Sequence, residues 1–131
     1  YDEDSFKTFT DVYYKSEETQ KLVEPFKPWL WRTHFLNFRK GGYFPPHRDM
    51  RTSDEQKSMR LLVPISLCNP ADMYFMYEDK SLYFKYGSVY FLNTNKKHSI
   101  FSYSDEAIML IMNIECSEDS VKQVIKLNKW K

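Results

Sequence analysis

The sequence predicts a mainly β protein, built as a sandwich or a barrel, with helices only at its two ends. Between residues 29 and 114, short segments rich in aromatic and β-branched residues alternate with turns that contain Gly, Pro, Asn or Asp. Aromatic residues make up 18% of the chain, a share that favours strands and a bulky core. About eight strands are expected, and short strands separated by regular turns are typical of sandwiches and barrels.

The 131 residues are most simply a single domain, 1–131, in three parts. Residues 1–28 are expected to form a helical N-terminal segment, because Phe6, Phe9 and Val12 recur at helical spacing. Pro25 and Pro28 should end that helix. Residues 29–114 form the expected β core, and residues 115–131 the C-terminal helix, with acidic residues near its start.

The strands of the core are placed by their aromatic and apolar runs and by the turns between them. The segment 107–114 is continuously apolar, which predicts a strand that is buried on both faces. In the first strand, Arg32, His34 and Phe38 share one face. The expected strands are residues 29–39, 43–46, 58–67, 73–77, 81–86, 89–92, 98–103 and 107–114.

Charge and cysteine content restrict the possible partners. The net charge of +1 gives no electrostatic case for a nucleic-acid or an anionic membrane partner. No apolar run approaches 18 residues, so we expect a soluble, cytoplasmic protein without a membrane partner. Neither Cys68 nor Cys116 lies in a Cys-x-x-Cys motif. Both are expected to be free, partly buried thiols, although a disulfide between them is an alternative.

Three residues could form a metal site. His47 and Asp49 are two positions apart, so in an extended strand their side chains point to the same side. His98 lies at the beginning of another expected strand. Two imidazoles and one carboxylate, with coordination positions left open, form the facial triad that suits non-haem Fe(II) oxygen chemistry. A His-x-Asp sequence also occurs by chance in loops, so the spacing alone does not establish the site.

The surrounding motifs strengthen this interpretation. In order, the chain has a Gly-Gly turn, Pro-Pro-His-x-Asp ending at Asp49, Arg-Leu-Leu-Val-Pro-Ile from Arg60, Tyr-Gly-Ser-Val-Tyr-Phe-Leu-Asn from Tyr86, and then His98. Over residues 29–114 this order resembles the Fe(II)/2-oxoglutarate-dependent oxygenases. It is most similar to the aspartyl/asparaginyl β-hydroxylase and proline hydroxylase type.

The resemblance implies a double-stranded β-helix, which is a cupin-like jelly roll. It implies that His47, Asp49 and His98 bind Fe(II) and are the catalytic residues, with 2-oxoglutarate and O2 as cosubstrates. Three protein ligands leave three coordination positions, two for the keto acid and one for O2. The implied reaction is hydroxylation of a small-molecule amino acid or of a peptide or protein side chain.

One departure from the family concerns the anchor of 2-oxoglutarate. The family commonly has an arginine about ten residues after the second histidine, where it binds the distal carboxylate. Ile108 stands there, and no Arg or Lys occurs between His98 and Lys122. Arg60 is our candidate for that role, because a guanidinium binds a carboxylate bidentately. The alternative is that Arg60 is a surface charge at a strand end.

Other residues lie near the expected site. Leu62 replaces a histidine that the relatives carry two residues after the arginine. Arg51 could bind an acidic group of the substrate, or it could be a solvated loop residue. Arg39 is a further cation expected near the mouth of the site. His34 is expected to be a structural histidine and not a ligand, because no carboxylate lies two residues away.

Three rival functions stay open. The first is a cupin-like metal-binding protein of another class, such as an isomerase or a metal-dependent binding module. The second is a catalytically vestigial β-sandwich, which the missing arginine keeps open. The third, a nucleic-acid demethylase, would need a basic groove, which the net charge does not favour.

Overall fold

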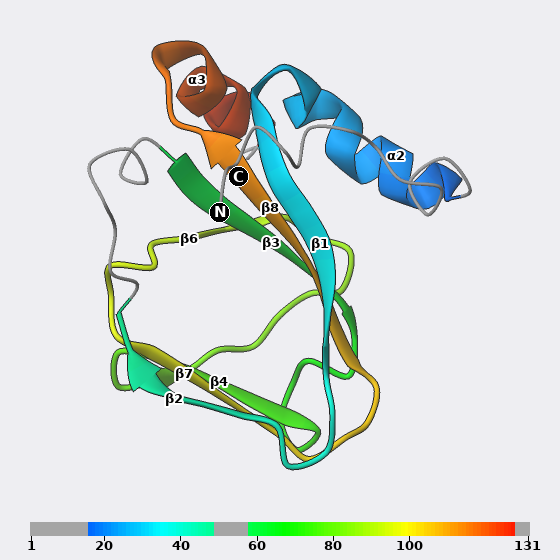
Figure 1. Ribbon diagram of the computed structural model, residues 1–131, viewed down its shortest axis with the longest axis vertical. Coiled ribbons are helices and arrows are strands. Elements are labelled where there is room, and N and C mark those ends of the chain that lie inside the picture. Colours follow the sequence, from blue (N-terminus) through cyan, green and yellow to red (C-terminus); the bar gives the residue numbers. More distant parts are fainter. Residues whose placement is uncertain (1–15, 49–57, 128–131) are drawn as a thin grey trace.

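The computed structural model describes residues 16–48 and 58–127, which form two antiparallel sheets flanked by helices (Figure 1). The first sheet has four strands in the order β1-β8-β3-β6, and the second has four in the order β2-β7-β4-β5. The strands are β1 (Leu30–Phe38), β2 (Tyr43–His47), β3 (Ser58–Ser66), β4 (Met73–Tyr77), β5 (Lys80–Ser81), β6 (Tyr90–Leu92), β7 (His98–Ser102) and β8 (Ala107–Glu115).

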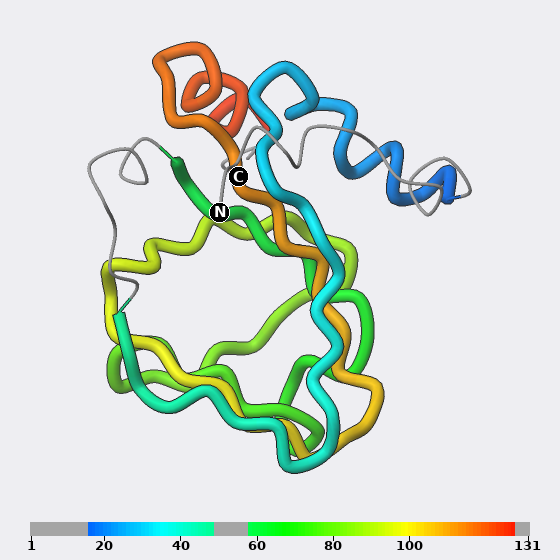
Figure 2. Tube along the Cα trace, in the orientation of Figure 1, coloured from blue at the N-terminus to red at the C-terminus, as the bar shows by residue number. Residues whose placement is uncertain are grey.

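The order of these strands identifies the fold. The chain alternates between the sheets from β1 to β4, adds β5 beside β4, and alternates again from β6 to β8. Figure 2 traces the path of the chain by colour. The strands on either side of β8 are β1 and β3, and those on either side of β7 are β2 and β4. Two four-stranded antiparallel sheets wound in this way are a jelly roll, the double-stranded β-helix of cupin-like proteins. The predicted fold class is therefore confirmed.

Two helical segments cover the outer face of the first sheet. They are α2 (Glu17–Val23), which continues into the 3-10 helix η2 (Glu24–Trp29), and α3 (Glu118–Leu127). Gln123 joins them, because its side-chain amide donates a 3.0 Å hydrogen bond to the carbonyl of Pro25. The apolar residues buried between helices and sheet are Val23, Phe26, Met59, Leu61, Val63, Leu110, Met112 and Ile114.

Strand β8 is buried on both faces, as its continuous apolar sequence predicts. Leu110, Met112 and Ile114 pack toward the helices. The alternate residues Met109 and Ile111 belong to the second core, which lies between the two sheets. This central strand therefore contributes to two hydrophobic cores at once, and its sequence has no polar face.

Two expected elements differ from the structure. Residues 81–86 were expected to form a strand, but β5 ends at Ser81. The backbone of Phe84 instead bonds the side chain of Asn69, which accepts from its N–H at 2.7 Å and donates to its carbonyl at 2.9 Å. At the N-terminal end, the α-helix ends at Val23, and both prolines lie within η2. Phe6, Phe9 and Val12 lie outside the described residues.

The two cysteines are free, and they differ in environment. Cys68 is buried, as expected, but Cys116 is exposed, so the expectation of partial burial was wrong for Cys116. The thiol of Cys68 lies 3.1 Å from the carbonyl oxygens of both Ser66 and Ile108. Burial raises the pKa of the Cys68 thiol, so its reactive thiolate is scarcer than that of an ordinary cysteine at neutral pH.

This difference predicts selective alkylation. Iodoacetamide should label Cys116 rapidly in the native protein and label Cys68 only after unfolding. Mass spectrometry of tryptic peptides at several reaction times measures both rates. The Cys116→Ser variant is the control and should take up no label while folded. Equal labelling of the two thiols in the native protein would contradict the burial of Cys68.

Within residues 16–48 and 58–127, no helix is both long enough and apolar enough to cross a bilayer.

Candidate metal centre

Two of the three predicted metal ligands lie side by side at one end of the jelly roll. His47 is the last residue of β2, and His98 is the first residue of β7. The two strands are antiparallel neighbours in which His47 pairs with His98. The imidazole ring centroids are 4.3 Å apart. The sequence proposed this proximity from the residue types and strengthened it by the family resemblance, and the pairing of the strands provides it directly.

The hydrogen bonds of both histidines suit metal binding. Nδ1 of His47 lies 2.7 Å from the carbonyl oxygen of Pro45, and Nδ1 of His98 lies 2.8 Å from that of Lys96. A carbonyl oxygen only accepts, so in each ring Nδ1 carries the hydrogen and donates it. Nε2 then carries the lone pair. A backbone carbonyl that fixes the tautomer in this way is typical of metal-bound histidines.

The third predicted ligand and the predicted substrate residue cannot be placed. Asp49 and Arg51 both lie outside the described residues. Within residues 16–48 and 58–127, no group of three His, Cys, Asp or Glu side chains is arranged to hold a metal ion. The donor set of the described residues is thus an imidazole pair, which fits Fe(II) if a carboxylate completes it.

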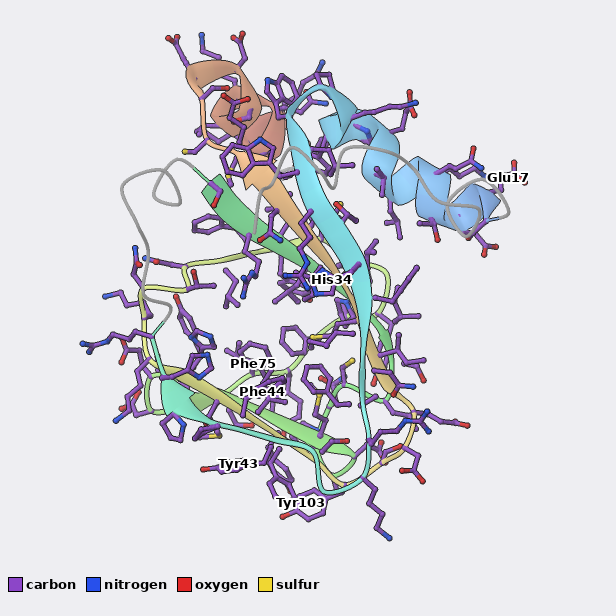
Figure 3. The ribbon with its side chains drawn as sticks, in the orientation of Figure 1. Glu17, His34, Tyr43, Phe44, Phe75 and Tyr103 are labelled. Atoms are coloured by element: carbon purple, nitrogen blue, oxygen red, sulfur yellow. The ribbon has the colours of Figure 1, made fainter. Side chains whose placement is uncertain are left out.

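A cavity of about 190 Å³ extends from the histidine pair into the space between the sheets. Its polar lining gathers at the end where the histidines lie, and its far end is closed by Phe38 and Met109. Figure 3 shows His34 on the first sheet and Phe44 and Phe75 on the second, with their side chains in this interior. The lining residues are Arg32, His34, Leu36, Phe38, Phe44, His47, Arg60, Leu62, Phe75, Leu92, His98, Ile100, Met109 and Ile111.

Arg60 lines this cavity, and a hydrogen-bonded row of side chains orients it. Its Nε donates to Oδ1 of Asn113 at 3.4 Å, and Nδ2 of Asn113 donates to the carbonyl of Arg32 at 2.9 Å. Arg60 and Asn113 are directly paired residues of β3 and β8, and Arg32 is on β1, on the other side of β8. The row therefore crosses three strands, and the amide of Asn113 holds the guanidinium at one edge.

Asn113 should matter for stability because it is largely buried. The variant Asn113→Leu removes both hydrogen bonds and leaves their buried partners unsatisfied. We therefore expect the free energy of unfolding to fall by about 1–3 kcal/mol. Urea unfolding followed by circular dichroism measures this loss. The control is Asn37→Leu, at an exposed position of β1, which should change the free energy of unfolding by less than about 0.5 kcal/mol. Equal midpoints for the two variants would contradict the role of Asn113.

The structure corrects one sequence-based interpretation and places two further residues in the cavity. Arg39 is not near the mouth: it follows β1 at the opposite end, beside the turn where the Lys40 N–H donates to Asp105. Arg32, on the same strand, is the arginine that lines the cavity. His34, which was expected to be structural, lines the cavity. Its face was predicted correctly, and the inward alternation with Arg32 was the signal that could have found both residues.

The structure shows where position 108 lies, at which the family commonly has its carboxylate-binding arginine. Ile108 lies between Ala107 and Met109 on β8 and is not among the residues that line the cavity. Successive side chains of a strand point to opposite faces. In this chain, position 108 therefore points away from the interior that Met109 and Ile111 line.

The comparisons with known proteins give the following. No protein-family model matches the sequence, and no curated protein matches it. Among solved structures, one similar protein is a predicted oxalate decarboxylase from Thermotoga maritima, at 15% identity and a TM-score of 0.48, covering 71% of this chain and 73% of that one. Another is KdgF from a Halomonas species, at 12% identity and a TM-score of 0.48, covering 70% and 74%.

A third similar structure is the cupin domain of Schizosaccharomyces pombe Cnp3, at 12% identity and a TM-score of 0.45, covering 75% of this chain and 64% of that one. At this similarity the comparisons carry no functional argument. The strand order and the histidine pair define the class of protein: a jelly-roll protein of the cupin-like fold, with a candidate metal centre at one end of its interior cavity.

Proposed function

We propose that the protein is a non-haem Fe(II)- and 2-oxoglutarate-dependent oxygenase that hydroxylates an amino acid or a peptide or protein side chain. The observation that supports this most is the pair His47 and His98. Each presents Nε2 as its lone-pair nitrogen, and both border a cavity that also contains a guanidinium. Metal ligands and a carboxylate-binding group in one small cavity suit a cosubstrate that must bind both.

The residues have separate roles in this proposal. His47, Asp49 and His98 would hold Fe(II), which when bound supplies the activation of O2 that couples decarboxylation of 2-oxoglutarate to C–H hydroxylation. The carbonyls of Pro45 and Lys96 keep the two imidazoles in the ligating tautomer. No step of this assignment needs a residue at the family's usual arginine position.

Arg60 would bind the distal carboxylate of 2-oxoglutarate. Its Nε donates to Asn113, which orients the guanidinium on the cavity wall, and a guanidinium can bind a carboxylate bidentately. Leu62, Phe75 and Ile111 form an apolar part of the cavity wall, and a less polar surrounding strengthens such a charged pair. A cavity of about 190 Å³ suits a small dicarboxylate better than a larger ligand.

Succinate formation tests this function. Aerobic incubation with Fe(II), ascorbate and 2-oxoglutarate should release succinate, because members of this enzyme class turn the cosubstrate over slowly without their substrate. The His98→Ala variant, assayed beside the wild type, should release none above the protein-free rate. An iron-loaded wild type that forms no more succinate than this variant would contradict the proposal.

One observation favours a second candidate, a cupin-like metal protein of another class. All three histidines of the chain, His34, His47 and His98, line the same cavity. As the structure places them, the three imidazoles are not arranged to hold one ion together, so a metal centre without Asp49 would require His34 to approach the other two. Under that alternative, His34→Gln lowers metal affinity, whereas the oxygenase assignment leaves iron bound in this variant. Metal analysis of the two proteins distinguishes the candidates.

A further inference from the structure

A second cavity lies on the other side of His47. It has a volume of about 310 Å³, is open to solvent, and is lined by His47, Arg48 and Lys97. His47 also lines the interior cavity that contains Arg60. The imidazole of His47 therefore lies between two spaces, one inside the jelly roll and one at its surface.

The outer cavity is positively charged on its described side. Arg48 follows β2 directly, and Lys97 precedes β7 directly, so the pairing of these strands brings the two cations together. The carbonyl of Lys97 accepts a 2.7 Å hydrogen bond from the N–H of Glu78, which ties it to the turn between β4 and β5. Arg48 and Lys97 are exposed, and neither forms an ion pair with any residue of 16–48 or 58–127.

Two described acidic residues lie near this cavity. The turn that bonds Lys97 carries Glu78 and Asp79, both exposed. Neither lines the cavity, so within residues 16–48 and 58–127 the side chains that face it are the two cations and His47. An arginine offers a planar fork and a lysine offers a compact charge, and both bind carboxylate and phosphate oxygens.

We propose that this outer cavity, defined by Arg48, Lys97 and His47, binds an oxyanion group of a peptide substrate, a carboxylate or a phosphate. The inference rests on the proposed function, because it assigns the interior cavity to the cosubstrate and the outer one to the substrate. A solvent-open cavity admits a side chain of a longer peptide, which an enclosed cavity would not. Two described cations and a net charge of +1 favour an acidic peptide over nucleic acid.

The test uses three fluorescein-labelled Gly-Ser peptides that differ at one central residue, which is Asp, phosphoserine or Asn. Fluorescence anisotropy at low ionic strength measures their dissociation constants with the wild-type protein. We expect the Asp or the phosphoserine peptide to bind more tightly than the Asn peptide. In the double variant Arg48→Glu/Lys97→Glu this preference should fall at least about fivefold.

The matched control is Lys85→Glu, an exposed lysine close to Phe84, whose backbone bonds Asn69 at the other end of the jelly roll. This variant should keep the wild-type preference. The proposal is overturned if no acidic peptide binds more tightly than the Asn peptide, or if Lys85→Glu loses the preference as fully as the double variant. The tighter of the two acidic peptides identifies carboxylate or phosphate as the group bound.

Two further measurements distinguish failure of this inference from failure of the proposed function. A single-stranded oligonucleotide that binds more tightly than both acidic peptides, with the same dependence on Arg48 and Lys97, would overturn the peptide assignment in favour of nucleic acid. Succinate formation is measured on the same samples. Succinate without a peptide preference defeats this inference alone, and a peptide preference without succinate defeats the proposed function alone.

Discussion

Replacement of His98 by alanine should abolish Fe(II) binding. His98 would supply one of only two imidazoles in a three-ligand site, and the residue is buried, with 5% of its surface exposed. Even the loss of an outer hydrogen-bonding partner lowers metal affinity by about 10- to 100-fold in known sites, so the loss of a ligand should exceed that. Anaerobic equilibrium dialysis against Fe(II), followed by iron analysis, measures the effect.

The control for this experiment is the third histidine. His34→Gln removes an imidazole from the same cavity without removing a predicted ligand, so iron should remain bound near the wild-type stoichiometry. Circular dichroism establishes that both variants are folded. Retention of stoichiometric iron by folded His98→Ala would rule out the His47–His98 pair as a metal centre.

Replacement of Arg60 by alanine should weaken 2-oxoglutarate binding without loss of iron. Truncating one partner of a buried, hydrogen-bonded charge pair costs about 2–5 kcal/mol, which corresponds to a dissociation constant at least about thirtyfold higher. The change should leave iron in place, because Arg60 lies on β3 in the sheet opposite the two histidines. Isothermal titration of the anaerobic iron-loaded protein with 2-oxoglutarate measures the constant.

Arg39→Ala provides the matched control, since this exposed arginine lies at the opposite end of β1. It should bind 2-oxoglutarate with the wild-type affinity. If Arg60→Ala also binds normally, the carboxylate is anchored elsewhere. Arg32, on the same wall of the cavity, would then be the next residue to replace.

Much of the fold could be predicted because the rules involved are local. Alternation of side chains in strand 29–39 placed Arg32, His34 and Phe38 on one face, which the structure confirms as the inward face. The continuous apolar run of β8 predicted burial on both sides, and the helices on one face and the second sheet on the other explain it. Gly41, with φ of +83°, permits the turn between β1 and β2 that its sequence predicted.

The errors arose where the long-range pairing of strands determines the end of the sheet at which a residue lies. Alternation gives the face of a residue but not the end of the sheet at which it lies, so Arg39 was expected at the mouth and Arg32 was overlooked. Phe38 pairs with Ala107, and Arg60 pairs with Asn113. These pairs show at which end of the sheet each residue of β1 lies. The expected strand at 81–86 failed for a similar reason, because the distant side chain of Asn69 bonds the backbone of Phe84.

In the proposed function, His47 and His98 hold an iron that 2-oxoglutarate chelates inside the jelly roll. The most direct test is an anaerobic titration of the Fe(II)-loaded protein with 2-oxoglutarate, followed by visible absorption spectroscopy. The account predicts a charge-transfer band of the chelated keto acid that saturates with cosubstrate and is missing in His98→Ala. Bound iron without any such band in the wild type would contradict the account and favour a cupin-like protein of another class.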